Sequence, residues 1–320
     1  MTAPPVDLYA RNTPLHPLDR LGERLGLAPG RLWMKRDDLT GLAGGGNKAR
    51  KLEFLVADAL VRGCDTLITS GALQSNHVRM TAAAAARHGM ACHGVIYGTP
   101  PERTQGNLVL DDLLGLAAHV VADRDDVPDR IAEVTDQLSS SGAAPYVIPG
   151  GGSSAVGAQG YVVAADEIRA AFDGAPLLVC AVGTAGTYAG LVVGCGGYSD
   201  VMGVDVRAVP GIEGQIPELV AATASAAGRA APRGSVTVDA GQPEPYGQPT
   251  ALTMDALRLV ATTEGIALDP VYTGRAMAAL VSASRSGSLD PDRPTVFVHT
   301  GGLPGLFVDA VTPWVEPLGH

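Results

Sequence analysis

The sequence predicts an α/β fold built from parallel βαβ units, with helices on both faces of the sheet. Two observations carry this prediction. Short apolar segments alternate regularly with amphipathic helical segments from Lys51 onward, and several of the helical segments end at a glycine. Strand after helix after strand at this spacing is typical of parallel sheets. The length of 320 residues allows one large or two medium domains.

The expected elements follow one another along the chain. Residues 51–63 form an amphipathic helix that ends at a glycine, and residues 66–71 form a short buried strand. Four further helix–strand pairs are expected at 80–89 and 91–98, 107–116 and 119–123, 129–142 and 145–149, and around Gly160 and 176–183. Two later strands are expected at 201–209 and 294–302, and the polar segment 233–250 is expected to be irregular.

Composition argues against several functional classes. The chain is 46% apolar and 18% charged, a balance typical of folded globular proteins. Its net charge of −10, without a basic block, argues against nucleic acid or an anionic membrane surface as the main partner. The longest apolar stretch, 177–194, is interrupted by glycines and threonines, so we do not expect it to span a membrane. A small molecule is the expected partner.

The four cysteines predict buried thiols rather than a metal site. Cys64, Cys92, Cys180 and Cys195 show no CxxC spacing and no histidine-rich neighbours. We therefore expect structural thiols in a reducing cytoplasm, and no zinc or other metal centre. The first fifteen residues lack the basic and apolar segments of a secretory signal, which also favours a cytoplasmic location.

The use of lysine is the most unusual feature of the composition. Lys35, Lys48 and Lys51 are the only lysines, and the other basic residues are arginines. A lysine amine can form a Schiff base, whereas the arginine guanidinium stays protonated. Lys48 follows three glycines and Asn47, which predicts a chemical role for it. Ordinary surface charge explains Lys35 and Lys51 equally well.

The loops that follow the predicted strands are the expected ligand-binding segments. In parallel sheets, ligands bind at the carboxyl ends of the strands. Five loops meet this condition: the one around Lys48, and those at 71–77, 150–153, 183–187 and 299–302.

Two of these loops carry recognisable chemistry. Residues 74–77 are all polar, which exceeds what one helix cap needs and suggests a bound carboxylate or ring oxygen. His77 within them is expected to be a structural hydrogen-bonding residue. The loop 182–187, VGTAGT, precedes a helix and suggests an anion site, although a glycine-rich turn for close packing remains the alternative. It matches neither nucleotide-binding glycine motif. A phosphate site together with one isolated lysine suggests pyridoxal 5′-phosphate.

The chain resembles the fold-type II pyridoxal-phosphate enzymes, in the branch that contains D-cysteine desulfhydrase and 1-aminocyclopropane-1-carboxylate (ACC) deaminase. The matching motifs, from Lys35 to Phe307, are KRDDLTGLAGGGNKARKLEFL, LQSNHVRMTAA, GNLVLDDLLG, YVIPGGGS, VGTAGTYAGL, LDPVYTGRAM and HTGGLPGLF. The resemblance implies a tryptophan synthase β-like fold with two twisted, parallel-type sheets flanked by helices and the active site in the cleft between the domains. It further implies a large cofactor-binding domain at 1–50 and 161–320, a small domain at 51–160, and a homodimer.

The resemblance also implies roles for single residues. Lys48 is then the Schiff-base lysine, and Asn76 contacts the phenolic oxygen of the cofactor and helps to bind substrate. Ser75 and Gln74 help to hold the substrate carboxylate, with Ser75 also catalytic. The cofactor phosphate is expected against the loop that comprises Gly183, Thr184, Ala185, Gly186 and Thr187.

Two tyrosines and two threonines complete the implied site. Tyr246 and Tyr272 are expected to be catalytic, because a phenol can assist the departure of a leaving group. Thr300 is expected at the cofactor and Thr273 at the substrate. These threonines match the pattern associated with D-cysteine desulfhydrases, whereas ACC deaminases have glutamate and leucine there. A carboxylate at the pyridine nitrogen would strengthen the electron sink, and a threonine cannot do so.

The expected reaction is therefore α,β-elimination on a β-substituted amino acid, with D-cysteine giving pyruvate, ammonia and hydrogen sulfide. The alternatives are ACC deamination to 2-oxobutyrate and ammonia, and a lyase for another β-substituted alanine such as L-cysteate. A non-catalytic cofactor-binding protein is a more distant alternative. Gly44, Ala185 and Asp309 depart from the family's pattern; Gly44 is expected to enlarge the pocket, and Asp309, if it points inward, to repel an acidic group.

Overall fold

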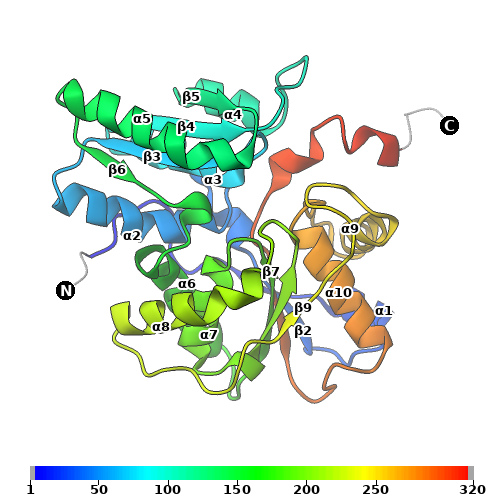
Figure 1. The fold of residues 1–320 in the computed structure, drawn as a ribbon. Coiled ribbons are helices and arrows are strands. Elements are labelled where there is room, and N and C mark those ends of the chain that lie inside the picture. The colour runs from blue at the N-terminus through cyan, green and yellow to red at the C-terminus, as the bar shows by residue number, and fades with distance from the viewer. Residues whose placement is uncertain (1–3, 316–320) are drawn as a thin grey trace.

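Two sheets organise the chain in the computed structural model, which describes residues 4–315 (Figure 1). The larger sheet has six strands in the order β1 (Leu15–Pro17), β2 (Leu32–Lys35), β10 (Thr295–Val298), β7 (Leu177–Val182), β8 (Val201–Asp205) and β9 (Val238–Asp239). All neighbouring strands in it are parallel except β1, which pairs antiparallel with β2.

The smaller sheet has four parallel strands. Their order is β5 (Ala117–Val121), β4 (Ala91–Tyr97), β3 (Thr66–Ala72) and β6 (Pro145–Val147). The helices that follow or precede them are α2 (Lys48–Val61), α3 (Asn76–Arg87), α4 (Asn107–Leu113) and α5 (Val127–Ser140). Figure 1 shows α5 and α3 on opposite faces of this sheet, as the predicted βαβ pattern requires.

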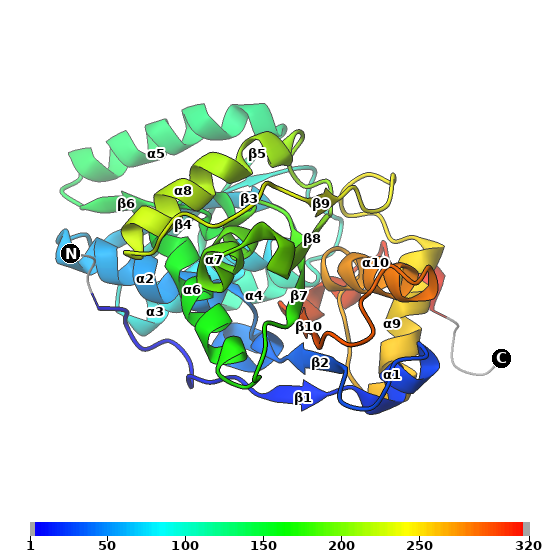
Figure 2. The same cartoon turned by 90° about the horizontal axis from the view of Figure 1, so that it is seen from below.

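Helices also cover both faces of the larger sheet, seen from below in Figure 2. One face packs against α6 (Ala155–Arg169), α7 (Gly186–Cys195) and α8 (Ile216–Ala226), and the other against α1 (Asp19–Arg24), α9 (Ala251–Glu264) and α10 (Thr273–Arg285). Strand β7 shows why both faces are apolar: Leu178 and Cys180 belong to the first core, while Val179 belongs to the second. Successive side chains of a strand point to opposite faces, so a strand covered on both sides must be apolar throughout.

The predicted fold class is confirmed, and the differences lie in element boundaries and in elements that the sequence did not predict. Helix α2 begins three residues before the predicted 51, and the helix predicted from 80 begins at Asn76, where the Ser75 hydroxyl accepts a hydrogen bond from the backbone N–H of Val78. The sequence did not predict strands β1 and β2 or helices α1, α8, α9 and α10. Segment 233–250 contains only the two-residue strand β9, which agrees with the predicted irregular structure.

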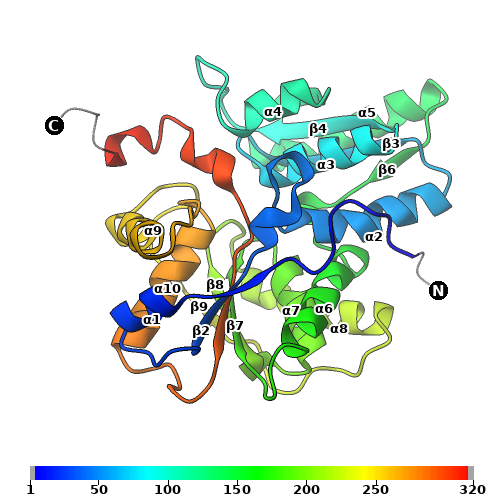
Figure 3. The same cartoon turned by 180° about the vertical axis from the view of Figure 1, so that it is seen from behind.

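Helix α2 packs against both α3 and α6, and so lies between the two sheets (Figure 3). The predicted domain boundaries after residues 50 and 160 fall inside α2 and α6. The division into domains remains a prediction. Within residues 4–315, every helix is too short or too polar to cross a membrane.

Candidate active site

One cavity of about 250 Å³ receives residues from both sheets. All five loops that follow the predicted strands contribute to its wall, because the carboxyl ends of parallel strands meet at one edge of each sheet. The predicted site residues that line it are Lys48, Ser75, Asn76, Gly183, Thr184, Ala185, Gly186, Thr187, Tyr246, Tyr272 and Thr300. Its size suits a small ligand.

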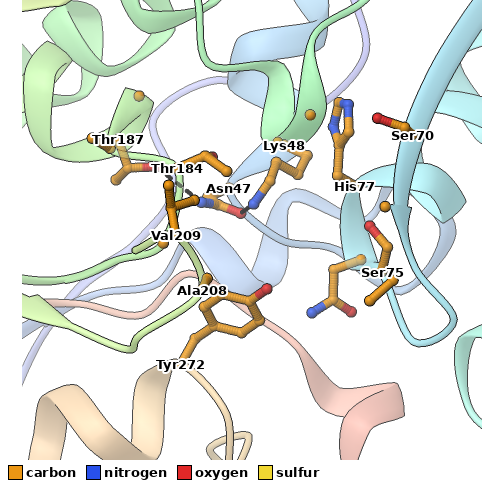
Figure 4. A pocket seen from close by; sticks show the side chains of 18 of the residues that line it. Asn47, Lys48, Ser70, Ser75, His77, Thr184, Thr187, Ala208, Val209 and Tyr272 are labelled. Carbon is orange, nitrogen blue, oxygen red and sulfur yellow. Dashed lines mark hydrogen bonds between the residues drawn. The ribbon is translucent and has the colours of Figure 1, made fainter. Parts of the chain in front are cut away.

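Lys48 is the first residue of α2, and its amine lies inside the cavity (Figure 4). The Nζ atom donates a hydrogen bond to Oδ1 of Asn47 at 2.8 Å, and Nδ2 of Asn47 donates to Oγ1 of Thr187 at 2.9 Å. Burial, assisted by the positive charge of Arg79, lowers the pKa of the Lys48 amine to about 8. The lowered pKa raises the neutral fraction of this amine near neutral pH.

The glycines before Lys48 are required by close packing. Gly46 has φ of +131°, and a Cβ there would lie 3.1 Å from the carbonyl oxygen of Thr300. A Cβ on Gly301 would lie 2.7 Å from Cα of Gly46. The two glycine-rich loops therefore pack backbone against backbone and hold the start of α2 against the end of β10.

The other two lysines are buried, so their interpretation as surface charges is wrong. Lys35 Nζ pairs with Oε2 of Glu167 at 2.8 Å, away from the cavity. Lys51 lines the cavity, and its Nζ donates to the carbonyl oxygen of Gly151 at 3.1 Å and to Oγ of Ser153 at 3.3 Å. Burial and the charge of Lys48 hold the pKa of Lys51 well below its usual range. Residues three apart on a helix lie on the same side of it. The spacing of Lys48 and Lys51 could therefore have predicted that both amines enter one site.

The loop 183–187 forms an anion cradle with Lys51. Ala185 adopts φ of +61° at the N-cap of α7, and the first residues of that helix, Gly186 and Thr187, line the cavity. Ser153 Oγ accepts from the backbone N–H of Gly186 at 3.1 Å and lies 2.7 Å from Oγ1 of Thr184. A Cβ on Gly186 would lie 2.8 Å from Lys51 Nζ, so the cradle leaves no room for a side chain. A helix N-terminus, hydroxyls and a lysine amine are donors that suit a phosphate group, so these residues fit the phosphate end of pyridoxal phosphate.

The side chains of the polar loop 74–77 point in different directions. Ser75 and Asn76 line the cavity, whereas Gln74 does not. Gln74 turns toward α4, where its Oε1 accepts from the backbone N–H of Asn107 at 2.8 Å and its Nε2 donates to the carbonyl oxygen of Gln105 at 3.1 Å. Its predicted contact with substrate thus has no support in the geometry.

His77 lies at the cavity wall with one nitrogen committed to structure. Thr69 Oγ1 donates to the carbonyl oxygen of Ile148, so it accepts from Nε2 of His77 at 2.8 Å. The other nitrogen, Nδ1, is buried without a partner among residues 4–315. Burial and the charges of Lys48 and Lys51 hold the pKa of this imidazole well below its usual range, so it stays neutral. This agrees with the structural role expected for His77.

Tyr246 and Tyr272 are in contact with each other at the cavity wall. Their hydroxyl oxygens lie 2.5 Å apart, and their rings pack edge to face. Burial raises the pKa of Tyr246 to about 12 and holds that of Tyr272 well above its usual value, so both phenols are neutral near neutral pH. Arg275 holds the irregular loop that carries Tyr246 by donating to the carbonyl oxygens of Glu244, Pro245 and Gln248.

The remaining predicted positions differ in their relation to the cavity. Thr300 lines it, but Thr273 does not: its Oγ1 donates to Oδ1 of Asp269 at 2.7 Å, at the start of α10. Neither Gly44 nor Asp309 lines the cavity. The Cβ position of Gly44 meets open space, so the expected enlargement of the pocket is wrong. Asp309 is exposed and bonded to Gln105, so it does not point inward and the condition for its expected repulsion of an acidic group is not met.

Comparison with known proteins identifies the family. The family model described as "Pyridoxal-phosphate dependent enzyme" matches residues 6–301, and the chain belongs to that family. Curated proteins from Salmonella paratyphi B and Salmonella newport, both named D-cysteine desulfhydrase, are 42% identical over 316 residues, covering 95% of this chain and 95% of theirs.

Solved structures give the same family and fold. A structure described as an ACC deaminase homologue matches with a TM-score of 0.87 and 36% identity, covering 95% of this chain and 94% of the other. Processed threonine deaminase isoform 2 from Solanum lycopersicum matches with a TM-score of 0.66 at 15% identity, covering 92% and 80%, and shares the fold. The chain is thus a fold-type II pyridoxal-phosphate-dependent enzyme of the D-cysteine desulfhydrase and ACC deaminase branch.

Proposed function

We propose that this enzyme is a lyase that eliminates the β-substituent of an amino acid, with D-cysteine as substrate and pyruvate, ammonia and hydrogen sulfide as products. The observation that carries the proposal is the 42% identity, over 95% of both chains, to curated D-cysteine desulfhydrases. The cavity supports it, because a partly neutral lysine amine and a pair of neutral phenols face the same small space.

We propose that Lys48 both anchors the cofactor and moves the proton. The bound cofactor supplies the electron sink that makes the Cα–H bond acidic. Nζ of Lys48 then accepts the Cα proton, which requires a neutral amine, and its lowered pKa provides one. Asn47 holds the amine through its Oδ1, so the position of Nζ is fixed before substrate enters.

The hydrogen-bond donors of the remaining cavity walls indicate which part of the cofactor or substrate each wall would bind. Lys51, Ser153 and the N-terminus of α7 would hold the cofactor phosphate. Asn76 would bind the phenolic oxygen, Ser75 would hold the substrate carboxylate near the N-terminus of α3, and Thr300 would contribute to the cofactor site.

We propose that the tyrosine pair serves the leaving group. A neutral phenol donates a proton to the departing sulfur, and the second phenol, 2.5 Å away, stabilises the resulting oxygen charge. Because both phenols keep their protons to high pH, the pair remains a donor throughout the neutral range.

ACC deamination is the second candidate, since the ACC deaminase homologue is 36% identical. Opening a cyclopropane demands a stronger electron sink than elimination of a good leaving group. Among residues 4–315, no carboxylate lines the cavity to keep a pyridine nitrogen protonated. Elimination is favoured for this reason.

The test is a substrate panel. Purified, cofactor-loaded protein is incubated with D- and L-amino acids, including D-cysteine, L-cysteate, β-chloroalanine and ACC, and pyruvate and 2-oxobutyrate are measured. We expect pyruvate from D-cysteine; 2-oxobutyrate from ACC without pyruvate from any β-substituted alanine would overturn the proposal. The variant Lys48→Ala should lose both turnover and the visible absorption band of the bound cofactor, while Arg62→Ala, at the exposed end of the same helix, should retain both.

We also propose a cytoplasmic homodimer. All four cysteines are free thiols, which is compatible with a reducing compartment. Molar mass in solution, measured by light scattering, tests the dimer against the 32.6 kDa of one chain.

A further inference from the structure

Arg79 is a fully buried arginine that lies behind the cavity wall without lining it. It occupies the first turn of α3, one turn after Ser75. Its three hydrogen bonds all go to neutral oxygens: NH1 donates to Oδ1 of Asn76 at 3.0 Å and to Oδ1 of Asn107 at 2.7 Å, and NH2 donates to the carbonyl oxygen of Gly45 at 2.9 Å. An arginine buried among neutral acceptors is costly, which calls for an explanation.

The first consequence concerns the Asn76 amide. Its Oδ1 accepts from Arg79 and also from Nδ2 of Asn107 at 3.1 Å. Asn107 is fixed in turn, because its Nδ2 also donates to the carbonyl oxygen of Gln74. With both donors behind it, Oδ1 of Asn76 is held away from the cavity, and the amide nitrogen faces the ligand as a donor.

The second consequence concerns the loop before Lys48. Gly45, whose carbonyl accepts from Arg79, stands three residues before the catalytic amine. A Cβ on Gly45 would lie 1.9 Å from the carbonyl oxygen of Asp38, so this loop packs closely against the neighbouring backbone and leaves no room for a side chain. Arg79 thus ties together the loop that carries the lysine and the asparagine expected at the cofactor ring.

The third consequence is electrostatic. Asp111 is the opposite charge that acts on Arg79, but both of its carboxylate oxygens, like Nε of Arg79, are buried without a hydrogen-bond partner among residues 4–315. Burial raises the pKa of Asp111 to about 7, so it neutralises the guanidinium only in part. The pKa of Arg79 is lowered by burial only to about 10, so it stays charged and disfavours the protonated form of Lys48.

We propose that Arg79 is a positioning residue of the cofactor site: it directs the Asn76 amide nitrogen into the cavity and fixes the glycine loop that presents Lys48. Its positive charge, passed on through Asn76, favours a negatively charged oxygen at that point of the ligand. The inference rests on the proposed roles of Lys48 and Asn76 and adds the residue that orients both.

The test measures cofactor affinity rather than turnover. Apo-protein is titrated with pyridoxal phosphate for wild type, Arg79→Gln, Asn76→Ala and the double variant, and the visible absorption band is recorded across pH. We expect Arg79→Gln to weaken binding at least about tenfold and to change the pH dependence of the band. The same substitution should have little further effect once Asn76 is alanine, because the two residues act as one unit.

Folding is monitored separately by thermal unfolding of each apo-protein. Should Arg79→Gln fail to fold, Asn107→Asp provides the second variant: it keeps Arg79 and its acceptor but places a carboxylate beside Oδ1 of Asn76, and should weaken cofactor binding by a similar factor. Unchanged affinity and band in a folded variant would overturn the proposal, as would an equal loss with and without Asn76. The proposed role of Lys48 is tested separately by Lys48→Ala. If that variant keeps the visible absorption band, the proposed function fails, whatever the result for Arg79.

Discussion

The hydroxyl oxygens of Tyr246 and Tyr272 lie 2.5 Å apart, although their residues belong to different elements. Tyr272 is the N-cap of α10, and Tyr246 lies in the irregular segment that precedes α9. So short a contact between two neutral phenols makes one the donor and the other the acceptor, and it couples their protonation.

Replacing Tyr272 by phenylalanine should therefore slow elimination most for poor leaving groups. We expect kcat for D-cysteine to fall roughly 10²-fold or more, with a smaller change in KM, because a proton donor acts in the transition state. β-Chloroalanine needs no protonation of its leaving chloride and should be affected far less. Steady-state kinetics on the two substrates check this, and equal losses for both would show that the tyrosine acts on something other than the leaving group.

The glycine loop gives a matched pair of substitutions. Gly46→Ala places a Cβ 3.1 Å from the carbonyl oxygen of Thr300 and should displace Lys48, with a large loss of cofactor binding. Gly44, two residues earlier, also has a positive φ, of +88°, but the Cβ of Gly44→Ala would meet open space. It should cost only about 1 kcal/mol of backbone strain and leave substrate preference unchanged. Altered selectivity in Gly44→Ala would restore the idea that this position shapes the pocket.

Asp111 should make stability depend on pH. Burial raises its pKa in the folded protein to about 7, well above the ordinary aspartate value, so the folded state binds the proton more tightly than the unfolded chain. This contribution is fully present below about pH 4 and is lost as pH rises through about 7.

The variant Asp111→Asn cannot ionise, so its stability relative to wild type should increase between pH 5 and pH 8. Asp112→Asn, at the exposed neighbouring position, serves as the control. Urea denaturation at both pH values measures the difference. A constant offset between Asp111→Asn and wild type would contradict the prediction.

Arg124 lies at the cavity edge, near Tyr246, and donates to the carbonyl oxygen of Ala208 at 2.8 Å. Its charge favours an anionic β-substituent, so Arg124→Gln should lower kcat/KM for L-cysteate, about tenfold for a lost charged contact, and leave the neutral β-chloroalanine nearly unchanged. If kcat/KM falls equally for both substrates, Arg124 stabilises the cavity edge and does not recognise the charge of the β-substituent.

Much of this site was predictable because, in a parallel sheet, the loops that follow the strands all lie at the same edge of the sheet. Lys48, Asn76 and Thr184 are distant in sequence, yet each follows a strand, and such loops converge. The direction of a side chain within a loop was not predictable in the same way. Gln74 turns to Asn107, 33 residues away, and Thr273 turns back to Asp269, since buried polar atoms take the nearest available partner.

Sequence patterns also could not predict the antiparallel strand β1 or the buried ion pair between Arg50 and Asp37. Strand β1 has three residues and no alternating pattern. Arg50 and Asp37 form a fully buried ion pair, but nothing in their local sequence separates them from surface charges. Such pairs depend on contacts that the complete fold creates.

Helix α2 begins at the catalytic amine, carries a phosphate-site lysine one turn later, and packs against a helix of each sheet. Any rotation of one sheet relative to the other would therefore act on a single helix that carries both amines of the ligand site. The spacing of Lys48 and Lys51 along that helix would not change, whereas their distances to Tyr272, at the N-cap of α10, would depend on how α2 packs against the larger sheet. Such a rotation would alter the separation of the proton acceptor from the proton donor while leaving the two lysines in the same relation to each other.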